Sequence, residues 1–167
     1  ATRGASSVSR MTDATGADAG SVPAASREPW QPAVIEAIDR LTSRVVHVTL
    51  RPEHWRPFLP GQHIDVRLTA EDGYQAQRSY SVASPPSQAS TLELVVERLD
   101  DGEVSPFFHE FAAAGDTLEI RGPFAEHFVW RPDSPGAVLL AAGGSGVAPF
   151  LSMVRERAQL ASPPPMA

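Results

Sequence analysis

The sequence predicts a mainly β fold: a six-stranded antiparallel Greek-key barrel with one short helix, followed by a single βα unit of an incomplete α/β domain. Three observations predict it. Six short segments rich in β-branched residues are separated by turn signals, a well-bounded helical segment lies between the fifth and the sixth, and the chain changes character near residue 133. We therefore expect a disordered segment at 1–29, a barrel domain at 30–132 and a truncated βα unit at 133–167.

Composition limits what the chain can do. Residues 1–29 are mostly Ala, Ser, Thr, Gly and Asp, so they have little to bury, and we expect the folded part to begin at Trp30. The chain has 167 residues, no cysteine and a formal net charge of -6. The acidic balance argues against a nucleic-acid partner, and the lack of cysteine excludes disulfides and thiolate-held iron–sulfur clusters. Any redox chemistry must then come from an organic cofactor or from a partner.

Two further classes are not expected. No apolar run reaches the length of a membrane span, and the N-terminal segment lacks the apolar block of a secretory signal, so we expect a cytoplasmic location. The five histidines show no paired metal-ligand spacing, and no metal site is expected.

The six expected strands are bounded by turn signals such as Pro60-Gly61, Glu71-Asp72-Gly73 and Asp101-Gly102. Helix remains an alternative for the first segment. Six short strands of this kind favour a closed antiparallel barrel. The expected strands are residues 33–39, 44–51, 63–68, 77–83, 92–98 and 117–121.

One short helix is expected at 105–115, between the fifth and sixth strands. Ser105 is a capping residue, Pro106 suits the first helical position, and Gly115 lies just past the end. After a stretch rich in proline and glycine, the continuous apolar run 137–142 predicts a strand buried on both faces, followed by a glycine turn and an amphipathic helix at 148–160. A lone βα unit exposes a sheet edge, which favours dimerisation.

The first motif is Arg78-Ser79-Tyr80-Ser81 in the fourth strand. Alternation places Arg78 and Tyr80 on one face, about 7 Å apart, so one ligand could meet both. A guanidinium binds phosphate oxygens, a phenol ring offers a flat face to a flavin ring, and Ser81 could present a hydroxyl or an amide to a nitrogen of that ring. Taken alone, the pattern is more often an ordinary half-buried strand with a surface arginine.

The second motif, Gly102-Glu103-Val104-Ser105, leads into the N-terminus of the short helix, where unpaired amides favour an anion. By itself it is also typical of a plain turn with a good N-cap. A strand that ends with Val95-Val96-Glu97 separates it from the first motif. Two anion-holding elements beside one strand suit a diphosphate.

The third motif is Gly143-Gly144-Ser145-Gly146, between the apolar run and the second helix. A glycine loop in this context cradles a dinucleotide phosphate. It is not the G-x-G-x-x-G fingerprint, because Ala148-Pro149 follow in place of the third glycine. A glycine cluster alone is as often an ordinary loop.

Taken in order, R-x-Y-S, G-x-x-S, G-P-F and G-G-S-G-V-A-P resemble the FAD-binding oxidoreductases of the ferredoxin reductase-like superfamily, over residues 31–161. The resemblance implies a six-stranded barrel that holds FAD. It also implies transfer of hydride from NADH or NADPH to the flavin, and then of electrons to an iron–sulfur, haem or oxygenase partner.

The same resemblance implies a role for each motif. It implies that Arg78 and Ser79 contact the FAD phosphates. It also implies that Tyr80, Ser81 and Ser145 lie at the flavin ring, where the reaction occurs. The ribityl or adenine side of FAD would be lined by Val95, Val96 and Glu97. The pyrophosphate would be held by the second motif, Gly102, Glu103, Val104 and Ser105. Nicotinamide and its phosphates would face the glycine loop, Gly143, Gly144, Ser145 and Gly146.

Three functions remain open. The later strands expected of a nicotinamide-binding domain are missing from the 167 residues, so the chain is either a flavin reductase or an FAD-binding module without nicotinamide-dependent activity. The third alternative is a β-barrel interaction domain without a cofactor.

Overall fold

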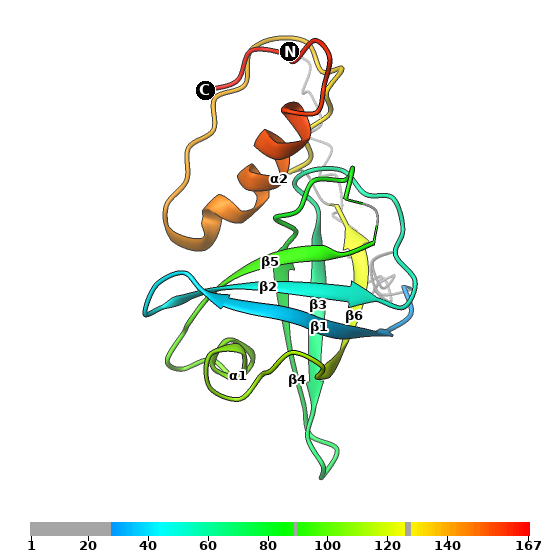
Figure 1. The fold of residues 1–167 in the computed structure, drawn as a ribbon, viewed down its shortest axis with the longest axis vertical. Coiled ribbons are helices and arrows are strands. Elements are labelled where there is room, and N and C mark those ends of the chain that lie inside the picture. The colour runs from blue at the N-terminus through cyan, green and yellow to red at the C-terminus, as the bar shows by residue number, and fades with distance from the viewer. Residues whose placement is uncertain (1–27, 89, 126–127) are drawn as a thin grey trace, which may run out of the picture.

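The computed structural model describes residues 28–88, 90–125 and 128–167. Six strands form one antiparallel sheet in the order β4-β3-β6-β1-β2-β5, and Figure 1 shows this sheet coiled into a barrel. Of the segment 1–29 that was predicted to be disordered, residues 1–27 lie outside the described residues. The strands are β1 (Gln31–Arg40), β2 (Val45–Pro52), β3 (His63–Thr69), β4 (Gln75–Ser81), β5 (Leu92–Glu97) and β6 (Thr117–Phe124).

All six predicted strands form within a few residues of their expected bounds, and the first segment is a strand rather than a helix. In β2, Val46, Val48 and Leu50 are buried while their neighbours are not. This alternation sends every second side chain into the barrel, which is why the strands could be predicted from a local pattern.

The two edges of the sheet meet at one place. Val82, just after β4, bridges to Leu94 in β5, and the amide of Ala83 donates to the carbonyl of Glu93 at 2.8 Å. Continued in register, the bridge would pair Tyr80 with Val96. No such pair forms among the described residues, so β4 and β5 separate beyond the bridge.

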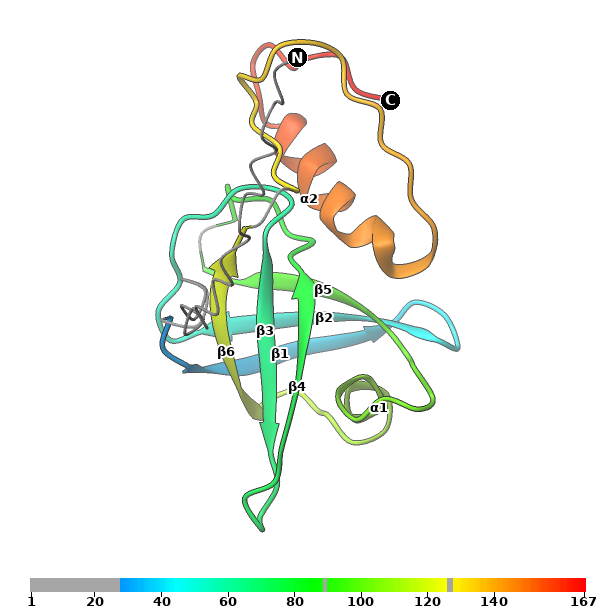
Figure 2. The ribbon, with the colours of Figure 1, turned by 180° about the vertical axis from the view of Figure 1, so that it is seen from behind.

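The helix α1 (Val104–Glu110) packs beside the barrel where β4 and β5 have separated, as the two opposite views of Figures 1 and 2 show. Its Phe108 is buried in the core. The predicted Ser105 cap is wrong: the helix begins one residue earlier, after Glu103, and no side chain caps it. The Ser105 hydroxyl instead accepts a hydrogen bond from the Leu99 amide at 3.0 Å.

The predicted strand at 137–142 is also wrong. The segment is extended, but its sole pairing among the described residues is an isolated parallel bridge from Val138 to Met166, and Leu139 is 81% exposed. An apolar strand needs neighbours to bury it on both faces, and among the described residues this segment has only the short pairing with residues 165–167. The turn that follows is the 3₁₀ helix η2 (Gly144–Val147), and α2 (Ala148–Arg157) forms where a helix was predicted.

Two kinds of feature are absent from the part of the chain that the structure describes. None of its helices combines the length and the apolar character needed to cross a membrane. None of its histidine, aspartate and glutamate side chains gather in threes that could hold a metal ion.

We predict that Gly61→Ala destabilises the barrel more than Gly73→Ala does. Both glycines have positive φ, +98° and +87°, so both substitutions introduce backbone strain of about 1 kcal/mol. A Cβ at Gly61 would also lie 2.1 Å from the Phe128 carbonyl oxygen, whereas a Cβ at Gly73 meets nothing within 4 Å. We expect a loss of about 2–4 kcal/mol in the free energy of unfolding at Gly61 and about 1 kcal/mol at Gly73, measured by urea denaturation. Equal losses would contradict the contact with Phe128.

Candidate functional site

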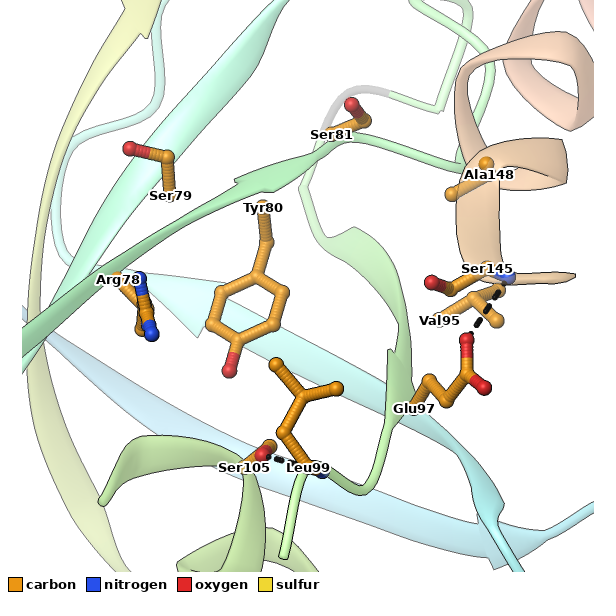
Figure 3. Close-up of a pocket in the computed structure, with 11 residues that line it drawn as sticks. Arg78, Ser79, Tyr80, Ser81, Val95, Glu97, Leu99, Ser105, Ser145 and Ala148 are labelled. Carbon is orange, nitrogen blue, oxygen red and sulfur yellow. Dashed lines mark hydrogen bonds between the residues drawn. The ribbon is translucent and has the colours of Figure 1, made fainter. Parts of the chain in front are cut away.

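A cavity of about 390 Å³ opens where β4 and β5 separate. It joins segments that are far apart in the sequence: β4, β5, the start of α1 and the glycine turn. The close-up in Figure 3 shows their side chains around one space. The lining residues are Arg78, Ser79, Tyr80, Ser81, Val95, Glu97, Leu99, Ser105, Ser145, Gly146 and Ala148.

Arg78 and Tyr80 lie on the same face of β4, as alternation predicts, and Figure 3 shows both side chains below the strand. The ring of Tyr80 packs edge-on against Phe108, with ring centroids 6.1 Å apart and an interplanar angle of 88°. Burial raises the pKa of Tyr80 to about 12, although the charge of Arg78 opposes the shift. The phenol is therefore neutral at ordinary pH and can donate a hydrogen bond.

Arg78 differs from the arginines on the outer face of the sheet. Arg67 binds Glu119 through two hydrogen bonds, of 2.9 and 2.7 Å, and Arg121 pairs with Asp65 at 2.9 Å. Among the described residues, Arg78 has no carboxylate within ion-pair distance. Its guanidinium is therefore available to an anion in the cavity.

The two serines of the first motif lie on the opposite face of β4 in Figure 3. The Ser79 hydroxyl donates to the Asp65 carboxylate, so that proton is already used. Ser81 is half-buried and pairs with His63 in the β3–β4 register. Both residues reach the cavity rim, but the face that points into it carries Arg78 and Tyr80.

On β5, the side chains of Val95 and Glu97 line the cavity, and Leu99 continues the same face beyond the strand. Val96 belongs to the barrel core instead and is fully buried, so a role for its side chain at the ligand is corrected. Leu99 was not among the predicted site residues. The alternation of residues 95, 97 and 99 could have found it.

Of the second motif, Ser105 alone lines the cavity. Since its oxygen accepts the Leu99 amide, its hydroxyl proton remains free to donate. Gly102 forms the turn, where a Cβ would crowd the Leu99 carbonyl and the Ser105 hydroxyl at 3.2 Å. Glu103 accepts a 2.7 Å hydrogen bond from the Tyr74 hydroxyl, and Val104 is buried in the core.

Of the glycine loop, Ser145 and Gly146 line the cavity, while Gly143 and Gly144 are exposed beside it. The Ser145 amide donates to the Glu97 carboxylate at 3.2 Å, a contact that Figure 3 marks with a dashed line. Gly144 has a φ of +57°, and a Cβ there would lie 3.1 Å from the same carboxylate. The loop is thus fastened to β5 through Glu97.

A buried polar network holds α2, and with it the glycine loop, against the barrel. The Ser152 hydroxyl donates to the Ser84 carbonyl at 2.6 Å, and both serines are fully buried. Glu93 accepts hydrogen bonds from Arg155 on α2 and from His47 on β2. Burial acts to raise the pKa of Glu93. The hydrogen bonds and charges of His47 and Arg155 act in the opposite direction and outweigh burial, so the pKa lies below its ordinary value of 4.5.

The lining groups fit a ligand with an anionic part and a flat ring. Arg78 can bind phosphate oxygens, and the Tyr80 ring offers an aromatic surface. The Ser105 hydroxyl can donate a hydrogen bond, while Val95 and Ala148 add apolar surface. This donor set suits FAD, and the fold and site together define a flavin-binding barrel.

Comparisons with known proteins support the conclusion that the barrel binds FAD. The family model described as the oxidoreductase FAD-binding domain matches residues 35–129. The chain belongs to this family, within the ferredoxin reductase-like FAD-binding oxidoreductases.

Two curated relatives and one solved structure illustrate the similarity. Methane monooxygenase component C of Methylosinus trichosporium is 35% identical over 139 residues, covering 80% of this chain and 39% of the relative. The reductase component of phenol 2-monooxygenase from Pseudomonas sp. (strain CF600) is 31% identical over 123 residues, covering 74% and 34%. A ferredoxin NADP+ reductase from Neisseria gonorrhoeae, solved with bound FAD and NADP, has a TM-score of 0.63 and 29% identity, covering 75% of this chain and 50% of that one. The chain therefore spans well under half the length of these curated relatives.

We predict that Glu93→Gln removes a pH-dependent part of the stability. A carboxylate whose pKa is lowered on folding stabilises the protein above its unfolded pKa, and this stability is lost as the pH falls through the folded pKa. The wild type should exceed the variant in free energy of unfolding above about pH 4.5, and the difference should shrink at lower pH. Urea denaturation at pH 6, 5, 4 and 3 measures it.

Glu36→Gln is the control, because Glu36 pairs with Arg51 at the exposed surface, where ion pairs contribute little. Parallel stability curves for the wild type and Glu93→Gln between pH 6 and pH 3 would contradict the role of Glu93.

Proposed function

We propose that this chain is the flavin-holding part of an NAD(P)H-dependent reductase that passes electrons to a redox partner protein. The observation that carries the proposal is the single cavity in which the guanidinium of Arg78, the ring of Tyr80, the hydroxyl of Ser105 and the glycine turn at Ser145 come together. The family membership supports the cofactor. FAD, when bound, would accept hydride from a reduced nicotinamide and release electrons to an acceptor.

In this proposal each lining residue contacts a particular part of the bound FAD. Arg78 binds the phosphates, and the segment 102–105 helps to hold them through the hydroxyl of Ser105, its member that lines the cavity. Tyr80 packs against the flavin ring, and Ser81 and Ser145 flank it with their hydroxyl groups. Val95 and Leu99 exclude water from one side, since both present apolar surface to the cavity.

The proposed division is a barrel domain at 30–132 and, at 133–167, the start of a nicotinamide-binding domain, in which the helix α2 forms but the expected strand does not. Two observations support it: α2 follows a glycine turn, and a compact polar network fastens it to the barrel. Nicotinamide binding and hydride transfer belong to the proposal for the longer protein, because the chain covers 34% and 39% of the two curated relatives.

The proposed partner is an oxygenase component or another iron–sulfur or haem protein. Two of the relatives are a methane monooxygenase component and the reductase component of a phenol 2-monooxygenase. In a system of this kind the reductase supplies electrons to a separate protein.

A second candidate is an FAD-binding module with little nicotinamide-dependent activity. It is favoured by the segment 137–142, which is extended and largely exposed rather than packed in a parallel sheet. A nicotinamide-binding half normally rests on such a sheet.

We predict that the chain retains flavin. FAD is added to the purified chain, the excess is removed, and the visible spectrum is recorded before and after NADH and NADPH are added in turn without air. We expect retained flavin bands that bleach slowly. Retained bands that do not bleach favour the second candidate, and no retained flavin in a folded chain contradicts both.

We predict that Arg78→Ala weakens FAD binding more than Tyr80→Ala does. Hydrogen bonds to a charged partner contribute about 1.5–3 kcal/mol, or roughly a 10- to 100-fold change in dissociation constant. Aromatic packing contributes about 0.5–1.5 kcal/mol, or roughly a 2- to 10-fold change. Quenching of flavin fluorescence on binding measures both constants.

Arg131→Ala is the matched control, since Arg131 is exposed and does not line the cavity. Its dissociation constant should equal that of the wild type. Equal weakening by Arg78→Ala and Tyr80→Ala would count against phosphate anchoring by Arg78.

A further inference from the structure

The cavity has opposite charges on its two walls. Among the described residues that line it, Arg78 on β4 and Glu97 on β5 are the two that carry a charge. Figure 3 shows them on opposite sides of the space, with the ring of Tyr80 between them. A ligand with one charged end and one uncharged end would therefore bind in one direction more readily than in the other.

The Glu97 carboxylate is held at the glycine turn. It accepts the Ser145 amide at 3.2 Å, and the Gly146 amide donates to the Gly143 carbonyl at 3.2 Å. The amides of Ser145 and Gly146 are thus in use, and the group that the turn holds at the cavity is a carboxylate, which repels a phosphate. The hydrogen bonding from Ser145 also lowers the pKa of Glu97, so the group is ionised at neutral pH.

We propose that Glu97 sets the direction of the bound flavin: it keeps the diphosphate away from the glycine turn and so places the uncharged ring beside its own carboxylate, with the diphosphate at Arg78. This inference rests on the proposed flavin binding. It adds to the proposed function a role for Glu97, whose charge favours one direction of binding over the other.

A measurable consequence follows for reduction. A flavin that takes up two electrons and one proton gains a negative charge on its ring, and a fixed charge near the ring tunes its electronics. With Glu97 beside the ring, the protein should bind the reduced form less tightly relative to the oxidised form. The Glu97 charge should then lower the midpoint potential of the bound flavin.

The test compares the full chain with Glu97→Gln. The glutamine side chain keeps an oxygen that can accept the Ser145 amide while it removes the charge. Glu110→Gln is the control, because Glu110, on α1, pairs with Arg98 and does not line the cavity, while the substitution removes the same charge. For each protein, the FAD dissociation constant is measured by fluorescence, and the midpoint potential by reductive titration with dithionite against a reference dye.

For Glu97→Gln we expect a dissociation constant of oxidised FAD within about threefold of the wild type. We expect the ratio of affinities for reduced and oxidised flavin to rise about tenfold, which for a two-electron couple is about +30 mV. The shift should fall as salt is added, since salt screens charges. Glu110→Gln should show no shift.

Two results would overturn the inference while the proposed function stands. One is an unchanged midpoint potential in Glu97→Gln. The other is a tenfold lower dissociation constant for oxidised FAD in Glu97→Gln without a shift in midpoint potential. This result would place the diphosphate, rather than the ring, beside Glu97. Failure of the wild-type chain to bind FAD would overturn the proposed function and this inference with it.

Discussion

The site depends on the incomplete closure of the barrel. The edge strands β4 and β5 join at the bridge between Val82 and Leu94 and then separate, so their facing edges have no partner strand beyond it among the described residues. Backbone groups at such an edge require hydrogen bonds from something else. One is supplied by α1, where a ring nitrogen of His109 lies 3.3 Å from the Val96 carbonyl oxygen. The cavity lies in the remaining space, which is why two strands can each contribute several residues to one ligand.

The two helices fix the walls of that space by different means. The α1 helix buries Phe108 in the apolar core and supports the Tyr80 ring edge-on, so this wall is set by packing. The α2 helix has a small apolar contact made by Ala148 against Ala83 and Val95, and it depends on buried hydrogen bonds for the rest. A buried polar group needs its partner to avoid a large penalty, so these bonds restrict α2 to one position. The position of Ser145 beside Glu97 follows from that restriction.

The sequence predicted what depends on local patterns and failed where distant contacts decide. Alternation found all six strands and the shared face of Arg78 and Tyr80, because a half-buried strand imposes a period of two. The Ser105 cap was mispredicted because the amide of Leu99, in the turn just before the helix, takes its hydroxyl oxygen, a contact that the capping pattern does not describe. The strand at 137–142 was mispredicted because apolar composition predicts burial only when other strands are present to provide it. The separation of β4 from β5 has no local signal, so the cavity itself could not be predicted, although its principal motifs could.

The distribution of charge argues that the cavity is built for an anion on one side. The neighbouring arginines of the same sheet, Arg67 and Arg121, are each matched by a carboxylate across the strands and stack on the ring of Trp30, 4.1 and 4.6 Å from its centroid. Cross-strand pairs of this kind stabilise a sheet. Arg78 lies in the same sheet, and its strand places it on the opposite face with no carboxylate partner among the described residues. Its register partner on β3 is Val66, a fully buried core residue, so this neighbouring strand supplies no negative charge at this position and the guanidinium is left available to an anionic ligand.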